Sequence, residues 1–359
     1  MRNTISFEDK VIQTIKKYEM LNDGDKIVLG VSGGPDSIAM LNVFKHIAEK
    51  YDLKSYNKEQ MSDDMQNNYE ESKKIKIIVA HINHMIRKEA IDDENYVRNY
   101  CEKNKIDFYS KSIDVVKIAN NSKIGTEEAG RIVRYDFFDE VMKKTGANKI
   151  AIAHNKNDKV ETIFMNLLRG SGIKGLRGIE PKRGKYIRPL IECERTEIEE
   201  YCKEKNLQPR IDKTNYENVY TRNKIRNLLI PYVKKEFNPN IIDTINRLSV
   251  VVSEEDDYME KQAKNIYKEV LIQELKENEE KQIILDLKKF NMQEKVIKSR
   301  VIRYTITSLV GSTNKIEQVH IEDIIKLCNN NIGNKFLTPN KNLKVWVKNR
   351  KIYFIKQNT

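Results

Sequence analysis

The stretch that decides the fold runs from residue 26 to residue 41 and reads KIVLGVSGGPDSIAML. Its first part, Lys26 to Val31, is a short apolar run with β-branched residues, which predicts a buried strand. Ser32-Gly33-Gly34 interrupts this run, and Pro35 follows where the first turn of a helix tolerates the missing N–H of proline. We therefore expect a strand, a tight glycine loop and a helix over residues 37–50.

The glycine loop is suited to binding a phosphate. Glycines let the backbone approach closely, and successive N–H groups at a helix N-terminus supply positive potential. The loop has neither the lysine of GxxxxGK[ST] nor the spacing of GxGxxG. It carries a carboxylate, Asp36, which would repel bound phosphates unless Mg²⁺ lies between them. Asp36 is thus a candidate Mg²⁺ ligand, although an aspartate that only favours the helix dipole would fit the same turn.

Outward from this loop, apolar strands alternate with helical segments. Further strands are predicted at residues 75–82, near 108–113 and at 149–153. Helices are predicted at residues 5–18, 126–144 and 158–168. This alternation is typical of right-handed βαβ units with a parallel sheet, so the first part of the chain is predicted to be α/β. The polar stretch 54–74 has no period and is interpreted as an inserted loop.

The pattern changes after Pro231. Residues 241–267 predict a long amphipathic helix, because Ile241, Ile245, Leu248 and Val252 fall on one stripe. Two more helices are predicted near residues 293–309 and 320–328, followed by a hairpin of residues 343–347 and 352–355. We therefore predict two domains, 1–237 and 238–359, the second smaller, mainly helical and ending in a β-hairpin.

Positive charge gathers near the end of the sequence. Residues 295–359 hold 13 Lys and Arg against 3 Asp and Glu, although the whole chain of 359 residues has a net charge of only +12. A basic region on a nearly neutral body favours a polyanionic partner, most often nucleic acid. A general abundance of lysine, with the side chains only exposed to solvent, would give the same excess of positive charge.

Composition excludes several other classes of protein. The longest aliphatic runs, such as Ile77 to Ala80, are far shorter than the ~20 apolar residues of a membrane span. The first residues have no apolar core of a secretory signal, and 4 Cys are too few for a disulfide framework. We expect a soluble, cytoplasmic protein without a membrane partner.

The six residues Ser32 to Ser37 read SGGxDS and resemble the loop of the N-type ATP pyrophosphatases, or PP-loop family. That family cleaves ATP between the α and β phosphates and adenylates an oxygen of its substrate. Other blocks follow in a fixed order. They are HINHMIR at residues 81–87, EEAGRIVRY at 127–135, AHNKNDKVET at 153–162, RGSGIKGL at 169–176, RPL at 188–190, and the segment 212–231 with RNKIR at 222–226. In order and spacing, these blocks closely resemble the tRNA(Ile)-lysidine synthetase family over about residues 26–240.

The resemblance implies an adenine nucleotide α-hydrolase-like, parallel-sheet catalytic domain, and it assigns a role to residues within the motifs. Asp36 and Asp158 would hold Mg²⁺, and the catalytic residues would be Asp36, Asp158, Arg134 and His154. ATP would be bound by Ser32, Gly33, Gly34, Pro35, Asp36, Ser37, His81, Arg169 and Gly170. The tRNA or lysine would contact His84, Arg87, Arg131, Arg188, Arg222, Lys224 and Arg226. The resemblance also implies that residues 1–237 are the ATP-binding catalytic domain and that the basic domain 238–359 contacts tRNA phosphates. A zinc site at the histidines is not expected, because HxNH and one distant His have no zinc spacing.

The implied reaction joins L-lysine to a base of isoleucine tRNA. The first anticodon cytidine of a CAU anticodon would leave its stack and enter the site, as chemistry on a base requires. Its C2 oxygen would attack the α-phosphorus of ATP, with loss of pyrophosphate. The ε-amine of lysine would then attack C2 and release AMP, so that the product pairs with A and the tRNA reads AUA. The family resemblance also implies ATP and Mg²⁺ as cofactors and a homodimer.

Two positions depart from the family pattern, which usually has His-His and Asp-Asp in the third block. Here Asn155 follows His154, and Asn157 precedes Asp158. A catalytically inactive RNA-binding relative is therefore one alternative. Another is a PP-loop tRNA thiolase, which needs reactive cysteines; the chain has no CxxC, and none of its cysteines adjoins a motif in the sequence. A GMP-synthetase-like amidotransferase would give no reason for the basic C-terminal part.

Overall fold

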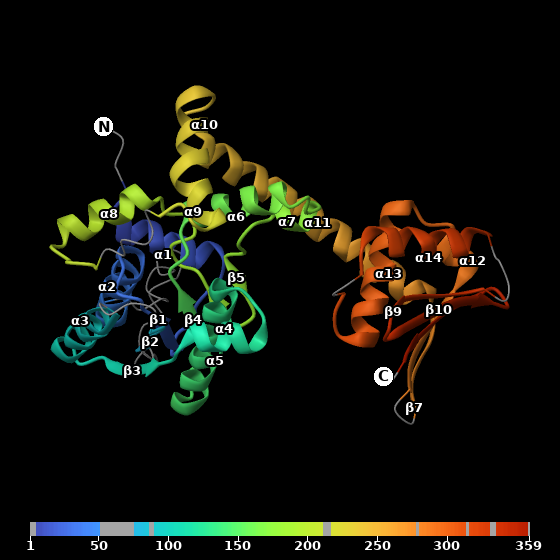
Figure 1. Ribbon diagram of the computed structural model, residues 1–359, viewed down its shortest axis with the longest axis horizontal. Helices are drawn as coiled ribbons and strands as arrows, with labels where there is room; N and C mark the ends of the chain where they lie inside the picture. The colour runs from blue at the N-terminus through green and yellow to red at the C-terminus, as the bar shows by residue number, and fades with distance from the viewer. Residues whose placement is uncertain are drawn as a thin grey trace, which may run out of the picture. The chain divides into compact units, whose positions relative to one another are not determined.

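The computed structural model describes residues 5–50, 75–85, 90–210, 217–277, 280–313, 316–330 and 335–357. The chain forms two compact units, Met1–Ser249 and Val250–Thr359, each described by itself below (Figure 1). This division falls inside helix α11 (Ile241–Val270), beyond the 237/238 boundary predicted from the sequence. The predicted insertion at residues 54–74 lies outside the described residues.

A mostly parallel sheet organises the first unit. Its strands are β1 (Lys26–Gly30), β2 (Lys76–Asn83), β3 (Asp107–Ser112), β4 (Lys149–Ile152), β5 (Lys182–Arg183) and β6 (Tyr186–Ile187). The order across the sheet is β3-β2-β1-β4-β6-β5, with only β5 antiparallel to its neighbour. The chain moves from β1 outward to β3 and then returns to the other side of β1 with β4. The strand order therefore reverses between β1 and β4, where open α/β sheets bind their ligands.

Helices connect these strands. They are α1 (Phe7–Lys17), α2 (Pro35–Lys50), α3 (Ala90–Lys103), α4 (Val115–Ser122), α5 (Thr126–Thr145), α6 (Lys156–Leu168), α7 (Ile173–Leu176), α8 (Arg195–Glu204), α9 (Thr221–Lys224), a π-helical turn (Ile225–Leu229) and α10 (Ile230–Glu236). The predicted α/β class and the helices expected at the N-terminus and after the first, third and fourth strands are confirmed. Helix α8 and the short strands β5 and β6 were not predicted, because their segments are brief or highly polar.

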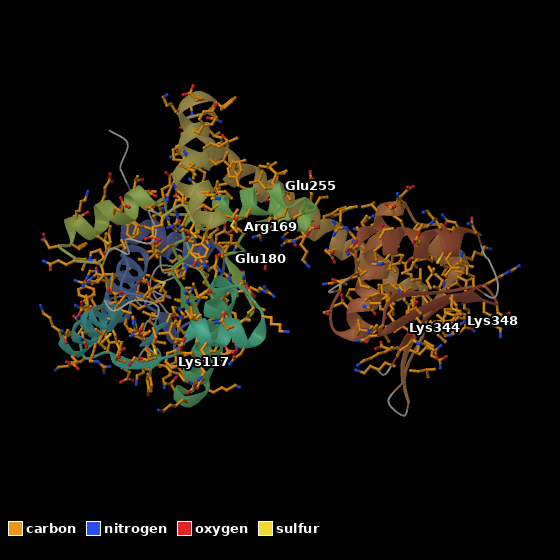
Figure 2. All side chains as sticks on the ribbon, in the orientation of Figure 1. Lys117, Arg169, Glu180, Glu255, Lys344 and Lys348 are labelled. Atoms are coloured by element: carbon orange, nitrogen blue, oxygen red, sulfur yellow. The ribbon has the colours of Figure 1, made fainter. Side chains whose placement is uncertain are left out.

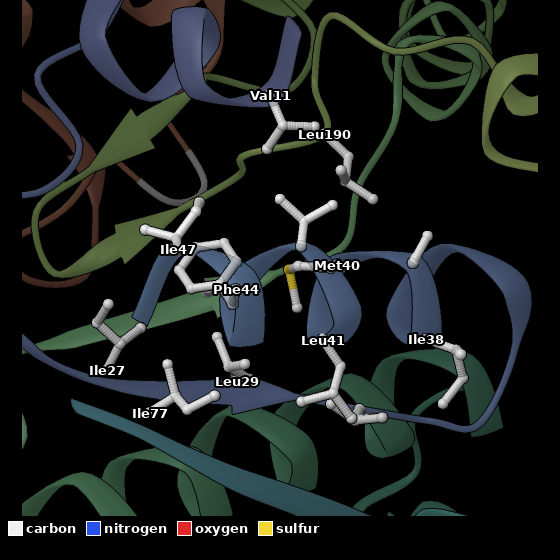
Figure 3. Close-up of a cluster of buried hydrophobic side chains, with 14 of the residues drawn as sticks. Val11, Ile27, Leu29, Ile38, Met40, Leu41, Phe44, Ile47, Ile77 and Leu190 are labelled. Carbon is white, nitrogen blue, oxygen red and sulfur yellow. The ribbon is translucent and has the colours of Figure 1, made fainter. Parts of the chain in front are cut away.

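Both faces of this sheet are buried. Ile27 and Leu29 of β1 point into a core formed with α1, α2 and α8 (Figure 3). Val28, which lies between them, points to the opposite face and packs with Phe137 and Phe138 of α5. The close approach of α5 requires a glycine at the end of β1, since a Cβ on Gly30 would lie 2.5 Å from the Phe138 ring. Burial on both sides fixes the carboxyl ends of the strands, and with them the loops that follow.

The second unit combines helices with an antiparallel sheet. Its elements after α11 are β7 (Leu271–Glu277), β8 (Glu280–Asp286), α12 (Leu287–Asn291), α13 (Lys295–Val310), α14 (Gln318–Asn330), β9 (Phe336–Asn340), β10 (Leu343–Lys348) and β11 (Lys351–Lys356). The predicted helices and the β10–β11 hairpin are confirmed. The hairpin belongs to a larger sheet of order β7-β8-β11-β10-β9, three of whose strands the sequence did not predict. Among the described residues, no helix is sufficiently long and apolar to traverse a bilayer.

Candidate active site

A cavity of about 810 Å³ lies in the first unit, lined by residues that follow β1, β2 and β4. Ser32, Gly34, Pro35, Asp36 and Ser37 come from the loop after β1. His81 to His84 come from the end of β2, and Ala153 and His154 follow β4. The cavity therefore lies at the carboxyl edge of the sheet, at the point where the strand order reverses. Its volume is within the range of small-molecule sites, about 300–1,000 Å³.

The glycine loop is held in its curled shape by Ser37. The Ser37 hydroxyl accepts hydrogen bonds from the backbone N–H groups of Ser32 (3.1 Å) and Gly33 (3.2 Å) and donates to the Gly34 carbonyl (3.0 Å). Gly33 has φ +94°, a left-handed conformation that L side chains rarely adopt. Arg210 supports the loop from outside, since its N–H donates to the Gly33 carbonyl at 2.9 Å. The loop is thus preorganised by contacts both within and outside the motif.

Asn155 links the two predicted metal ligands. Its Nδ2 donates to Asp36 Oδ1 at 3.0 Å, and its Oδ1 accepts from the Asp158 N–H at 2.9 Å. The carboxylate of Asp158 accepts in return from the Asn155 N–H at 3.0 Å, which completes a capping box at the start of α6. Asn157 has a separate role, because its Oδ1 accepts from the Arg195 N–H at 3.1 Å. The two family departures thus have structural partners in this chain.

The two aspartates have opposite pKa shifts. Burial and the nearby charge of Asp158 raise the pKa of Asp36 to about 6. Burial also acts to raise the pKa of Asp158, but the guanidinium of Arg222, the hydrogen bond from the Asn155 N–H and the guanidinium of Arg226 outweigh it and hold that pKa below its usual value. Asp158 is therefore ionised at neutral pH, whereas Asp36 titrates only about one pH unit below neutral pH.

Three arginines enclose Asp158 and a second buried carboxylate, Glu161. Arg222 contacts Asp158 Oδ1 and Glu161 Oε2, both at 3.0 Å. Arg226 contacts Asp158 at 3.1 Å and Glu161 at 2.7 Å, while Arg195 lies 3.7 Å from Glu161. Glu161 is 1% exposed. Arg226 lies in the π-helical turn, a distortion often found at functional sites, and Arg222 lies four residues before it.

Three histidines border the cavity, each with one ring nitrogen engaged. His81 Nδ1 lies 2.9 Å from the Val31 carbonyl, which makes Nδ1 a donor and leaves Nε2 as an acceptor. His154 Nδ1 accepts from Arg188 Nε at 3.2 Å, so its Nε2 carries the proton. Burial lowers the pKa of His154 to about 3. His154 is therefore a neutral hydrogen-bond donor at physiological pH, aligned by Arg188.

His84 and Arg134 contact each other at the wall of the cavity. Arg134 Nη2 lies 3.3 Å from His84 Nε2, and burial together with Arg134 lowers the pKa of His84 to about 4. Arg134 is half-buried, and its guanidinium supplies the positive charge at this wall. Arg131, three residues earlier in α5, is exposed and lies over the Tyr135 ring at 5.6 Å. Only the second of the two arginines thus reaches the cavity.

The structure does not bring every predicted residue to the cavity. Arg169 (Figure 2) and Gly170 are exposed at the end of α6, and Lys224 is exposed on α9. Arg188 is buried beneath His154, with its Nη1 donating to the Glu180 carbonyl at 2.6 Å. Arg222 and Arg226 both contact the carboxylates of Asp158 and Glu161, and of the two only Arg226 lines the cavity. Arg87 lies outside the described residues.

Sequence reasoning missed several residues at the site. Glu161 belongs to a quoted motif and lies three residues after Asp158, on the same face of α6, but nothing in the sequence indicated that Arg222 and Arg226 would contact both. Arg195, Arg210 and Cys202 line the cavity although they lie outside the motifs. The Cys202 thiol is buried, and burial raises its pKa to about 11, so it is not the reactive thiolate that a thiolase needs. The other three cysteines are also buried, and burial raises their pKa values to about 12.

Asp36 and Asp158 are carboxylates, the oxygen donors that Mg²⁺ prefers, but only Asp36 is among the residues that line the cavity, and Asp158 Oδ1 accepts from Arg222 and Arg226. Mg²⁺ commonly takes one or two protein carboxylates and completes its shell with water and substrate phosphates. Among the described residues, no group of three His, Cys, Asp or Glu side chains could hold a metal alone. The donor set therefore fits an ion that arrives with a phosphate ligand.

Comparison with known proteins agrees with this geometry. A PP-loop domain family matches residues 4–233. A tRNA(Ile)-lysidine synthase of Clostridium acetobutylicum is 46% identical over 333 residues, covering 92% of this chain and 66% of the relative. The enzyme of that name from Clostridioides difficile is 44% identical over 342 residues, covering 95% of this chain and 68% of the relative. The chain thus spans about two thirds of the length of these curated relatives.

A solved structure shares the fold. The U34-tRNA thiolase NcsA from Methanococcus maripaludis superimposes with a TM-score of 0.52 at 20% identity, covering 69% of this chain and 78% of the thiolase. At that identity the likeness concerns the fold alone. The order of motifs, the cavity that three of them line and the matches over most of the sequence point to one conclusion. The chain belongs to the tRNA(Ile)-lysidine synthase family of PP-loop, ATP-utilising ligases.

Proposed function

We propose that this chain joins L-lysine to C2 of the first anticodon cytidine of isoleucine tRNA with a CAU anticodon, at the expense of ATP. The observation that carries the proposal is the meeting of the glycine loop, Asp36 and His154 around one cavity in a chain of this family. The cytidine O2 attacks the α-phosphorus and pyrophosphate leaves. The ε-amine of lysine then forms the new C2–N bond, and the C2–O2 bond breaks to release AMP.

The residues of the cavity divide this work between binding and charge stabilisation. The loop from Ser32 to Ser37 binds the phosphates through backbone N–H groups and the N-terminus of α2. Asp36 and Asp158 would hold Mg²⁺, which would neutralise the departing pyrophosphate. Arg134 is the cationic side chain placed to stabilise the anionic transition state. His154, with its Nε2–H directed away from Arg188, donates a hydrogen bond to ATP or to the cytidine.

Other predicted residues take supporting roles in this proposal. Arg188 positions His154, while Arg222 and Arg226 position the carboxylates of Asp158 and Glu161. Exposed Arg169, Gly170, Lys224 and Arg131 suit contacts with RNA phosphates, which position a nucleic acid without reading its sequence. Recognition of lysine and of the CAU anticodon, a homodimer and a cytoplasmic location are further parts of the proposal.

The test follows two products in one reaction. Purified protein receives ATP, Mg²⁺ and labelled L-lysine, with and without unmodified CAU-anticodon isoleucine tRNA. We expect tRNA-dependent pyrophosphate release and incorporation of lysine into the RNA, both lost in Asp36→Ala. Asp107→Ala is the matched control, because Asp107 is an exposed aspartate of β3 outside the cavity.

Two outcomes would contradict the proposal. Pyrophosphate release without lysine incorporation would support the ATP site but would show that lysine is not the nucleophile of the second step. Tight tRNA binding with no pyrophosphate release would favour an inactive RNA-binding relative, and would make Asn155 and Asn157 the first positions to replace with the residues usual in the family.

A further inference from the structure

The outer face of the C-terminal sheet carries aromatic and basic side chains that the proposed reaction does not use. Along β10, Leu343, Val345 and Val347 are buried against the helices of the second unit. Side chains alternate along a strand, so Lys344, Trp346 and Lys348 lie on the opposite face. Figure 2 labels two of these lysines beside the strands.

Three aromatic residues at paired positions of neighbouring strands lie on this face. Trp346 pairs with Tyr353 of β11 and with Phe336 of β9. The rings of Trp346 and Tyr353 have centroids 5.0 Å apart and planes that differ by only 3°. Phe336 is 56% exposed, which is unusual for a phenylalanine. We call Phe336, Trp346 and Tyr353 the aromatic platform.

Lysines surround the aromatic platform. The Nζ of Lys344 lies 4.3 Å from the Phe336 ring centroid and 5.9 Å from that of Trp346. Lys348 and Lys351 face each other across the β10–β11 hairpin, an arrangement of like charges that destabilises a sheet. Asp286 is opposite Lys351 on β8, but its carboxylate also accepts from the Lys289 N–H as the cap of α12. An anionic ligand would offset this repulsion.

We propose that the aromatic platform and Lys344, Lys348 and Lys351 bind unpaired nucleotides of RNA. Nucleobases stack on flat aromatic side chains whatever their sequence, while lysines follow the phosphates. The sheet thus offers both parts of a single-stranded RNA site on one face. The choice of RNA over another polyanion rests on the proposed function, in which tRNA is the substrate. An acidic peptide would use the lysines but has no bases to stack on the aromatic rings.

Trp346 makes this site directly measurable. It is the only tryptophan of the chain, so intrinsic tryptophan emission reports on the platform without a label. The full chain is titrated with a single-stranded oligoribonucleotide of about ten nucleotides, a length within the range that such sites bind. We expect stacking to quench the Trp346 emission, with an affinity that falls as salt rises. The same RNA annealed to its complement should quench much less, because its bases are already stacked.

Three variants separate stacking from charge and from folding. Tyr353→Ala should weaken binding about tenfold, whereas Tyr353→Phe keeps the stacked ring and should bind as the wild type does. Lys344→Glu should weaken binding through repulsion of phosphates. Lys326→Glu is the matched charge control, because Lys326 is on α14, which packs against the buried face of the sheet, and it should bind within twofold of wild type. Thermal melting by circular dichroism checks that each variant folds.

Several results would overturn the inference. One is binding of fluorescently labelled oligonucleotide, seen by polarisation, without any change in Trp346 emission. Equal quenching by the duplex would be another. Quenching by polyglutamate but not by RNA would assign the face to an acidic protein partner. The lysine-incorporation assay is independent of these measurements. If RNA quenches Trp346 emission in a wild-type chain that incorporates no lysine, the RNA site is supported and the proposed reaction is contradicted.

Discussion

The cavity of the first unit and the aromatic platform of the second use charge in opposite ways. Beside the cavity, Asp158 and Glu161 are buried and enclosed by arginines, of which Arg195 and Arg226 line the cavity. On the platform, Lys348 is exposed and Lys344 and Lys351 are half-buried, and Lys348 and Lys351 oppose each other across a hairpin. Charge interactions are strong and depend on exact geometry where water is excluded, but are screened by salt at a surface. Substitutions should therefore have large effects at the cavity and small, salt-dependent effects on the platform.

The largest effect is expected for Asp158→Asn. The substitution keeps the shape and an oxygen that can cap α6, but it removes the negative charge shared by the proposed Mg²⁺ site and the arginines. We expect tRNA-dependent pyrophosphate release to fall about 10³-fold, a loss typical of removing one group that stabilises a transition state. Single-turnover release measured with labelled ATP checks this. A loss below tenfold would show that Asp158 serves only as a helix cap.

Removal of Glu161 should cost the most stability. Glu161→Ala leaves Arg222 and Arg226 to share the single carboxylate of Asp158, and breaking a buried charge cluster in this way typically costs about 3–5 kcal/mol. Urea unfolding followed by far-UV circular dichroism measures the loss. Trp346 emission should not report this unfolding transition, because Trp346 lies in the second unit and Glu161 in the first.

A buried ion pair in the second unit provides the comparison. Arg300 contacts Asp256 at 2.7 Å and also Glu260 at 2.8 Å. Asp256→Ala affects a single arginine, which keeps its contact with Glu260, so we expect a smaller loss of about 1–3 kcal/mol, seen by Trp346 emission. If Asp256→Ala proves more costly than Glu161→Ala, the arginine cluster at the cavity contributes little to stability.

The raised pKa of Asp36 predicts a pH dependence with a definite sign. Because its pKa in the folded state is about 6, above the ordinary value of 3.8, the folded protein holds a proton there that the unfolded chain releases. Asp36 therefore favours folding at low pH, and this contribution is lost as pH rises from about 4 through 6. Asp36→Asn should accordingly raise the melting temperature by a few degrees above pH 6, but not near pH 4.

Nucleotide binding should show the reverse trend. A protonated Asp36 cannot bind Mg²⁺, so affinity for ATP with Mg²⁺ should fall as pH drops through about 6. In Asp158→Asn the repelling charge is gone, and the midpoint should move to lower pH. Isothermal titration between pH 5 and 8 checks both; an unchanged midpoint would mean that burial alone raises the pKa of Asp36.

The smallest effect is expected for Lys348→Ala on the platform. Loss of one exposed phosphate contact should weaken tRNA affinity only a few fold at low salt, and reduce the slope of log affinity against log salt by about 1. Filter binding over a series of salt concentrations measures this slope. An unchanged slope would show that Lys348 does not contact RNA phosphates, and only the aromatic residues of the proposed site would then remain to be tested.

Much of the fold was predictable because its signals are local. The run from Lys26 to Val31, the glycine loop and Pro35 each specify their own backbone, and β1 and α2 follow from them. Strands β7 and β9 of the second unit were not predictable in this way. β7 is polar and β9 contains Pro339, so neither shows the alternation of a half-buried strand. They become strands because β8 and β10 offer free edges for hydrogen bonding.

The sequence by itself determined the α/β class, the phosphate loop, the order of the motifs and the family. Each of these depends on neighbouring residues or on spacing along the chain. Only the tertiary structure decided which charges meet: Arg226 reaches Glu161 across 65 positions, and Asn155 reaches Asp36 across 119. The physical reason is that such pairs form where packed strands and helices end, and their energies depend on burial that no local pattern encodes. The same holds for the aromatic platform, whose three rings come from two strands of a hairpin and a third strand beside it.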